Sequence, residues 1–388
     1  MRFLSWTRRL SALAAAAVFV CAAQAGAQAN LSTQGFGFPP GQFSTRTWGT
    51  GGAIAELDPF SPVNPASIAL QTSRIITFQI EPELRTVKSP GGSERTTTAR
   101  YPNISVAFPV GKGVVLGLGA STLLDRTSTT EFNTNQVLDN ADTVPIQTRY
   151  RIDGAMSDVR LAAGWNATRW LRLGLGAHAI TGHNLVEIGQ TFDDTSQFAD
   201  FSQSIVLSFS GYAASAGLQA ASKNWTLALS GRFGGDLRAT IEDTTLSKAR
   251  VPLHFGGALA YTGIANSAIA IRTAHDSWSD LDGLGTAGLK GVDSWDSSIG
   301  ADFAGPRLGS RTIFLRTGYR IRTLPFQAFG LDGVAHDVDE NSVSGGLGTT
   351  FANGRVLTDF AAIYANRSAG LPVSEHAWTL SIGISIRP

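Results

Sequence analysis

The chain has 388 residues and a formal net charge of +1, and only 16% of its residues are charged. Soluble domains average about 25% charged residues, and no basic patch dominates here, which argues against both an ordinary soluble domain and a nucleic-acid partner. Glycine supplies 43 residues, about 11% of the chain, against an average near 7%. Beyond the N-terminus no apolar run approaches the roughly 18 residues of a membrane helix.

The first 29 residues have the three parts of an export signal. Arginines at positions 2, 8 and 9 give a positive region, and Leu10–Ala23 gives an apolar core. Small-x-small sites follow, and we expect cleavage after Ala27 or Ala29. Residues 1–29 are therefore predicted to be a signal peptide. A retained membrane anchor is the alternative, and the short apolar core disfavours it.

Cys21 is the only cysteine and lies inside this segment. The bulky Phe19 and Val20 before it are a poor context for lipidation. Cleavage would leave a mature chain without cysteine, which removes disulfides and thiol chemistry. Removal of the three arginines would lower the formal net charge from +1 to −2.

Residues 30–70 show little hydrophobic alternation and are rich in Gly, Pro, Ser and Thr. We expect them to form a small folded plug rather than part of a wall, with a disordered leader as the alternative. Within this segment, the Asn64-Pro65-Ala66 triplet predicts a stiff corner, because Pro65 fixes its own φ angle and biases Asn64 towards extended geometry. The Asn64 side chain can also satisfy backbone groups in an irregular buried segment.

From residue 71 onwards, alternating apolar and small or polar residues predict about fourteen strands, an even number as bacterial barrels require. The expected strands are 73–88, 96–109, 113–128, 145–165, 170–188, 203–221, 224–242, 249–262, 266–279, 292–304, 311–324, 340–352, 355–366 and 375–387. Period-two alternation places the two residue sets on opposite faces of each strand. The predicted fold is therefore an all-β transmembrane antiparallel barrel over residues 71–388.

Several charged and imidazole side chains fall on the polar face of these strands. An arginine facing lipid near the bilayer midplane costs about 2–4 kcal/mol, so such residues should point into the lumen. The lumen-lining candidates are Arg172, His178, Arg232, His254, Arg316 and Arg320.

The connections between the strands divide into two kinds. Short turns occur at 223–224, 263–266 and 353–354, whereas longer polar segments occur at 125–144, 190–203, 281–292 and 325–340. Outer-membrane barrels have short periplasmic turns and long outer loops, so this difference predicts the orientation of the barrel. Aromatic residues near strand ends suit an interfacial girdle: Trp165, Trp170, Trp225, Tyr261, Tyr364 and Trp378.

The last strand alternates clearly, with large apolar residues at every second position from Trp378 to Ile386. We expect it to close the barrel. Barrel proteins commonly end on an aromatic residue that the assembly machinery reads, but this chain ends Ile386-Arg387-Pro388.

Residues 48–70 resemble the N-terminal plug motif of the FadL-type family of outer-membrane long-chain fatty acid transporters. The matching positions are Gly51-Gly52-Ala53, Asp58, Asn64-Pro65-Ala66 and Ile68-Ala69, while Ser67 stands where the family usually has glycine. Weaker likenesses are Val251–Tyr261 with its Pro252, the ending Trp278-Ser279-Asp280, and Leu315–Tyr319.

This resemblance implies a fourteen-stranded barrel with a small N-terminal hatch in its lumen. It also implies passive uptake of long-chain fatty acids or other hydrophobic molecules, with capture outside, hatch movement and lateral exit through the wall. The hatch and ligand-gating candidates are Gly51, Gly52, Asp58, Asn64, Pro65 and Ala66. The family's kinked third strand is not evident, although glycines at 111, 113, 117 and 119 could permit a bulge or gap there.

Signals for catalysis and metal binding are weak, and we expect no enzyme activity, no metal and no cofactor. The six histidines show no metal-binding spacing, and no nucleophile elbow or phosphate-binding loop is present. Two acidic groups, at 276–282 and 337–340, could hold a cation, although solvated loops explain them more simply.

Three other functions remain open. A FadL-like barrel could act as a secretion or scaffold protein of the PorV type, a wide polar lumen would indicate a general porin, and a rim cluster of Ser, His and Asp would indicate an enzyme. The expected partners are outer-membrane lipids, a hydrophobic small-molecule ligand and the barrel assembly machinery. We expect a monomer located in the bacterial outer membrane.

Overall fold

The computed structural model describes residues 36–90, 92–137, 143–192, 199–284, 290–308, 311–330 and 333–388. The predicted signal peptide lies outside these residues. The strands are β1 (Ile75–Ser89), β2 (Gly92–Gly111), β3 (Val114–Asp125), β4 (Ser128–Val137), β5 (Thr143–Asn166), β6 (Leu171–Phe192), β7 (Phe201–Ser222), β8 (Trp225–Ile241), β9 (Thr244–Arg250), β10 (His254–Tyr261), β11 (Ser267–Asp276), β12 (Ser294–Leu308), β13 (Arg311–Phe329), β14 (Ala335–Phe351), β15 (Val356–Ser368) and β16 (Ser374–Ile386). Short helical segments are α2 (Thr45–Gly49), η1 (Pro65–Leu70), η2 (Trp278–Leu284) and η3 (Ala352–Gly354).

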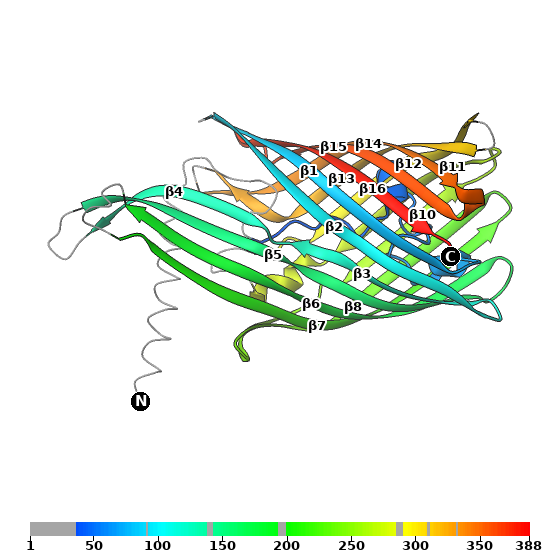
Figure 1. Cartoon of the computed structure of the whole chain (residues 1–388), viewed down its shortest axis with the longest axis horizontal. Helices are drawn as coiled ribbons and strands as arrows, with labels where there is room; N and C mark the ends of the chain where they lie inside the picture. Colours follow the sequence, from blue (N-terminus) through cyan, green and yellow to red (C-terminus); the bar gives the residue numbers. More distant parts are fainter. Residues whose placement is uncertain are drawn as a thin grey trace.

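Fourteen of the described strands form one closed antiparallel barrel (Figure 1). Neighbours in sequence pair with one another except where β4 and β9 intervene, and the ring closes where β16 pairs with β1. At the two interruptions β3 pairs with β5 and β8 pairs with β10, which leaves β4 and β9 outside the ring. The fourteen predicted strands correspond one to one to this ring, so the predicted fold class is confirmed.

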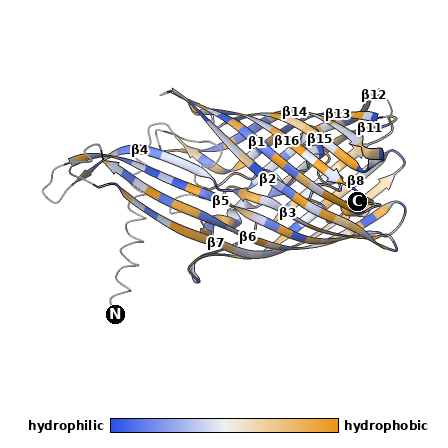
Figure 2. Ribbon diagram, in the orientation of Figure 1, coloured by the Kyte–Doolittle hydropathy of each residue, from blue (hydrophilic) through white to orange (hydrophobic). Residues whose placement is uncertain are grey.

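Apolar and polar residues alternate along the barrel strands (Figure 2), and many large apolar residues of these strands are exposed. On β16 the side chains of Trp378, Leu380 and Ile384 are exposed, whereas Ser381 and Ser385 on the opposite face are buried. Aromatic pairs stand on neighbouring strands, with ring centroids 4.9 Å apart for Trp225 and Tyr261 and 5.0 Å apart for Tyr364 and Trp378. This pattern is typical of a barrel surrounded by lipid.

Two segments predicted as long loops are largely strand, so those predictions are wrong. The segment 125–144 contains β4, and β13 and β14 extend through most of 325–340. β4 pairs with the outer part of β5, and β5, β6 and β7 continue beyond the ring as a sheet that protrudes to the left of the barrel in Figure 1. We call this sheet, residues 128–137, 143–153, 181–192 and 201–210, the arm.

The break in the third strand lies at Arg126–Thr127, outside the predicted glycine-rich segment 111–119. β3 ends at Asp125, and β4 resumes at Ser128 as the next partner of β5. Gly154 of β5 lies opposite the break with φ +150°, and its carbonyl accepts the N–H of Arg126. The glycine-rich segment produces only a register shift between Pro109 and Gly111.

The described N-terminal residues form a plug inside the lumen. α2 packs on β13, β14, β15 and β16, whereas η1 packs on β3, β5, β6 and β7. The plug therefore contacts opposite sides of the barrel wall. Its apolar residues Ala53, Ala55 and Ala66 are buried. In the part of the chain that the structure describes, no helix is long and apolar enough to cross a membrane.

Candidate functional site: the plug and the lumen

Asp58 organises the first half of the plug. Its Oδ2 accepts hydrogen bonds from the hydroxyls of Ser44, Thr47 and Ser61. Ser44 also caps α2, because its Oγ accepts the N–H of Thr47 at 3.0 Å. The three hydroxyl donors satisfy Oδ2 and so fix the shape of this segment, whereas the buried Oδ1 has no hydrogen-bond donor among the described residues.

Arg46 connects this segment to the wall. Its Nη2 lies 2.9 Å from Asp302 Oδ2 on β12, and its Nη1 lies 3.9 Å from Asp58 Oδ1. Burial disfavours the charged guanidinium, but the carboxylates of Asp58 and Asp302 outweigh burial and raise the pKa of Arg46 above its ordinary value.

Asn64 joins the second half of the plug to β7. Its Oδ1 accepts the N–H of Ala66 at 2.9 Å and so caps η1, in which Pro65 is the first residue. Its Nδ2 donates to the carbonyl of Glu56 at 2.9 Å and to that of Leu218 at 3.3 Å. The side-chain amide of Asn64 is fully buried and uses both of its polar atoms. Oδ1 caps η1 within the plug, and Nδ2 binds the plug carbonyl of Glu56 and the wall carbonyl of Leu218.

The wall approaches the plug so closely that only glycine fits at some positions. A Cβ on Gly217 of β7 would lie 2.0 Å from Asn64 Oδ1, and one on Gly174 of β6 would lie 2.2 Å from Ala66 N. On the opposite side Gly51 has φ +65°, and a Cβ there would lie 2.9 Å from the backbone N of Tyr319. Gly52 has φ +94° and packs on Phe43, so the two plug glycines form a tight left-handed turn against β13.

His178 belongs to a polar row across neighbouring strands. Its Nδ1 lies 2.8 Å from Asp158 Oδ1 on β5, and its Nε2 lies 2.8 Å from Ser215 Oγ on β7. Arg232 of β8 stands opposite Ser215 in register, and its Nη1 donates to Gln42 Oε1 of the plug at 2.9 Å. Gln42 in turn donates to Asp158 Oδ2 at 3.0 Å, which ties the plug to this row.

A second imidazole–carboxylate pair, His254 and Asp276, lies next to Arg232. His254 of β10 lies opposite Arg232 in register, and its Nδ1 is 2.8 Å from Asp276 Oδ1. Arg172, by contrast, is half-buried at the start of β6 and belongs to none of the described ion pairs.

Arg316 and Arg320 of β13 are buried and face the lumen. Arg316 Nη1 donates to Asp359 Oδ1 at 2.6 Å, and its Nε lies 3.3 Å from Asp302 Oδ2. Arg320 forms a two-bond contact with Asp296, with Nε–Oδ1 at 2.7 Å and Nη2–Oδ2 at 2.8 Å. Planar carboxylates suit this bidentate geometry.

Glu56 is a site residue that sequence reasoning missed. It is completely buried in the plug, accepts the Ser230 hydroxyl at 2.7 Å, and pairs with Arg272 Nε at 3.1 Å. Arg272 also donates to Asp296, so the plug carboxylate joins the wall network. The partners are more than 170 positions away, and no local pattern marks them.

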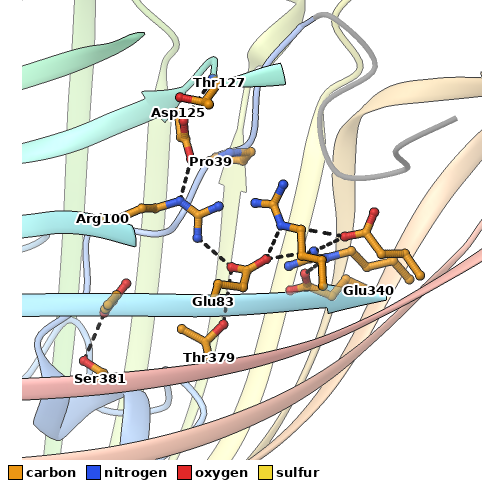
Figure 3. Close-up of polar contacts among 12 residues, drawn as sticks. Pro39, Glu83, Arg100, Asp125, Thr127, Glu340, Thr379 and Ser381 are labelled. Atoms are coloured by element: carbon orange, nitrogen blue, oxygen red, sulfur yellow. Dashed lines mark hydrogen bonds and ion pairs between the residues drawn. The ribbon is translucent and has the colours of Figure 1, made fainter. Parts of the chain in front are cut away.

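A layer of eight charged groups crosses the lumen, and Figure 3 labels Glu83, Arg100, Asp125 and Glu340 among them. We call it the ion-pair layer; its members are Glu83, Arg85, Arg100, Asp125, Arg322, Glu340, Arg367 and Glu375. Arg100 bridges Glu83 and Asp125 with two contacts of 2.6 Å, and Glu340 accepts from Arg322 and Arg367 at 2.6 Å each. Four cations face four anions, so the layer is formally neutral.

Phe38 of the plug stands at the centre of this layer. The guanidinium carbons of Arg85, Arg100, Arg322 and Arg367 lie 4.4–5.4 Å from its ring centroid. We call these four arginines the arginine cage.

Beyond the ion-pair layer the inward side chains become apolar. Along β13 the buried inward residues change from Arg320 and Arg322 to Leu324 and Phe326. These belong to a buried group, the apolar cluster, that includes Phe36, Met156, Ile180, Phe209, Leu237 and Trp278. An apolar mouth is unusual, because lumens of such barrels are generally polar.

The same face continues onto the arm. Val186 of β6 lies between Ile152 of β5 and Ile205 of β7 in register, and Leu207 packs against the apolar cluster. Ile205 remains 39% exposed and Phe201 remains 50% exposed. A mainly apolar and partly accessible stripe therefore runs along β7 from Phe201 past Ile205 to Leu207 at the apolar cluster.

Among the described residues, a cavity of about 70 Å³ lies between the plug and the wall, bordered by His178, Ser215, Arg232, His254 and Arg320 among others. Sites for drug-sized ligands measure about 300–1,000 Å³, so this cavity suits a few water molecules.

Asp158, His178 and Ser215 have the connectivity of an acyl-transfer triad. Ser215 nevertheless borders this small cavity, whose lining mixes charged residues such as Arg232 and Asp276 with apolar ones such as Leu123 and Trp278, and the cavity is too small for an acyl substrate of drug size. We interpret the row as packing between plug and wall. Among the described residues no group of three or more His, Cys, Asp or Glu side chains could hold a metal ion.

Comparison with solved structures identifies similar folds. A FadL homologue from Pseudomonas aeruginosa has a TM-score of 0.61 at 12% identity and covers 90% of this chain and 99% of its own. The CymD monoaromatic hydrocarbon channel has a TM-score of 0.57 at 13% identity, with coverage of 89% and 97%. The toluene transporter TodX of P. putida has a TM-score of 0.55 at 12% identity, with coverage of 90% and 99%. At these identities the likeness concerns the fold.

Comparison of sequences refines the expected family, since the FadL-type likeness holds at the coarse level of the fold. No curated protein matches the chain. The family model that matches is BamG, not FadL itself, and it spans residues 7–243, more than half of the chain. The FadL resemblance therefore holds for the architecture of barrel and plug, whereas by sequence the chain belongs to the BamG family.

Proposed function

We propose that the protein is an outer-membrane channel for passive uptake of hydrophobic molecules, with long-chain fatty acids as one candidate substrate class. The observation that carries this proposal is the apolar stripe from Phe201 and Ile205 into the apolar cluster. A lumen for ions or sugars would present polar side chains there. The similar folds include proteins described as hydrocarbon channels and toluene transporters, which supports the same substrate chemistry.

In this proposal the ion-pair layer and the plug close the path below the apolar cluster. The candidate gating residues are Asn64, Pro65 and Ala66, which hold the plug against β7, together with Gly51, Gly52 and Asp58. Lateral exit is the proposed route, since β2 pairs with β3 only from Asn103 to Gly111. A general porin is less suitable, because ion pairs cross the lumen among the described residues.

Equilibrium binding of a fluorescent fatty acid to the full protein in lipid nanodiscs tests the proposal. Ile205→Asp places a charge on the apolar stripe and should weaken binding about tenfold, equivalent to about 1.4 kcal/mol. Val206→Asp is the matched control, because Val206 is the next residue, is 51% exposed and points to the opposite face. Absence of saturable binding, or equal effects of the two substitutions, would contradict the proposal.

A second candidate function is that of a non-transporting partner of the barrel assembly machinery. Membership of the BamG family favours it, as does the small size, about 70 Å³, of the described cavity beside the plug. Under this alternative, deletion of the protein would lower the amount of other barrels in the membrane. Ile205→Asp would leave that amount unchanged.

A further inference from the structure

The barrel wall is incomplete between β2 and β3. The ladder between them runs from Gly111 paired with Val114 to Asn103 paired with Ser121. Beyond it β2 continues to Gly92 paired with β1, and β3 continues to Asp125 paired with β5. Within the described residues, the edges of β2 and β3 that face each other beyond Asn103 and Ser121 are therefore not paired to each other. We call this unpaired region the wall break, or the break.

Phe38 of the plug occupies the end of this break. Its N–H donates to the carbonyl of Asp125 at 2.6 Å, and its carbonyl accepts the N–H of Asp125 at 2.9 Å. The two residues form an isolated antiparallel bridge. Phe38 thus acts as a one-residue strand on the terminal residue of β3.

The neighbours of Phe38 hold it in this position. Gly37 has φ +121°, and a Cβ there would lie 2.9 Å from Leu124 Cγ and 3.0 Å from the carbonyl of Asp125. Only glycine permits this approach. Pro39 follows and biases Phe38 towards the extended conformation that a bridge requires, and its carbonyl accepts Arg322 Nη1 at 2.8 Å.

The ring of Phe38 links the two sides of the break. Arg100 of β2 stacks on the ring and also pairs with Asp125 of β3, with Nε–Oδ2 at 2.6 Å. Arg322 and Arg367 cover the ring from β13 and β15. One side chain therefore contacts the edges of the break and the centre of the ion-pair layer.

We propose that Phe38 is a latch that closes the wall break and the ion-pair layer together, and that its withdrawal from the arginine cage opens both. Four arginines and four carboxylates remain after withdrawal, so no charge is left without a counterion. This inference rests on the proposed function in one respect, because it states how the proposed channel is opened.

Pulsed electron paramagnetic resonance on the full protein in nanodiscs, without any ligand, tests the latch. Spin labels at Tyr101→Cys and Thr129→Cys, in a Cys21→Ser background, report the separation of β2 from β4, because both residues are exposed. Phe38→Ala should add a population with the labels farther apart by about 5 Å or more, one strand spacing. Phe38→Tyr should restore the original distance, because it keeps the aromatic face.

Phe43→Ala is the matched control. Phe43 is also a plug phenylalanine with two guanidiniums over its ring, those of Arg272 and Arg320, but it lies away from the break. It should leave the label distance unchanged. An unchanged distance in Phe38→Ala, or an equal change in Phe43→Ala, would overturn the latch.

Exchange of the Asp125 amide hydrogen provides a second measurement. Phe38→Leu keeps an apolar side chain of similar reach and should fold, yet it loses the aromatic face of the cage. It should speed exchange at Asp125 while exchange elsewhere in β3 is unchanged. Unchanged exchange at Asp125 would count against the latch.

The two proposals can fail separately. Separation of the spin labels in Phe38→Ala without fatty-acid binding to the protein would reject the uptake function alone. Fatty-acid binding without any effect of the Phe38 substitutions would reject the latch alone.

Discussion

Single residues in this protein combine a local role with a distant one. Asn64 illustrates the difference, because its capping of η1 follows from the local Asn-Pro-Ala sequence. Its contact with the carbonyl of Leu218 spans 154 positions and follows from no local pattern. The same holds for Glu56, which pairs with Arg272 across the lumen. Sequence reasoning therefore identified the corner of the plug but not its attachment.

The close approach of Gly217 to Asn64 gives a prediction at this scale. Gly217→Ala places a Cβ where Asn64 Oδ1 now lies, so the plug must shift. We expect the free energy of unfolding to fall by about 1–3 kcal/mol, the usual cost of overpacking. Urea unfolding in lipid and protease cleavage of the plug would measure the effect. Gly345→Ala is the control, because its Cβ would have no neighbour closer than 4.0 Å, and an equal loss there would refute the explanation.

Whole strands were predictable wherever lipid surrounds them. A strand that faces lipid needs an apolar side chain at every second position, so the sequences of strands such as β16 and β13 alternate between apolar and small or polar residues. β4 and β9 were missed because they lie outside the ring, where nothing enforces that alternation. β4 reads Ser-Thr-Thr-Glu at its start, which resembles a polar loop.

Depth in the membrane gives a prediction for β16. Leu380 and Ile386 are almost equally exposed, at 48% and 47%, but Leu380 is central in the strand and Ile386 is its last residue. Leu380→Arg should cost about 2–4 kcal/mol of folding free energy, and Ile386→Arg only about 0–1 kcal/mol. Unfolding in lipid vesicles measures both. Equal losses would mean that this face of β16 does not cross the bilayer.

The whole molecule is layered along the barrel axis. The plug fills one part of the lumen, the ion-pair layer crosses it around Phe38, and the apolar cluster lies beyond that layer and meets the arm at Leu207. Each layer uses inward residues of many strands, so it exists only when the ring is closed. Breaking one buried ion pair is costly because a charge remains without its partner, and this gives the layer its rigidity.

Glu83 gives the prediction for the molecule as a whole, because it joins both halves of the ion-pair layer by accepting from Arg85, Arg100 and Arg367. Glu83→Gln changes the formal charge of the layer from zero to +1 and weakens three charged hydrogen bonds. We expect the free energy of unfolding to fall by about 1–3 kcal/mol. We also expect an anion-selective leak current in planar bilayers, which measures opening of the layer directly. Glu187→Gln, on the outer face of the arm, is the control and should change neither quantity. A layer that stays closed to ions after Glu83→Gln would show that the plug alone blocks the lumen.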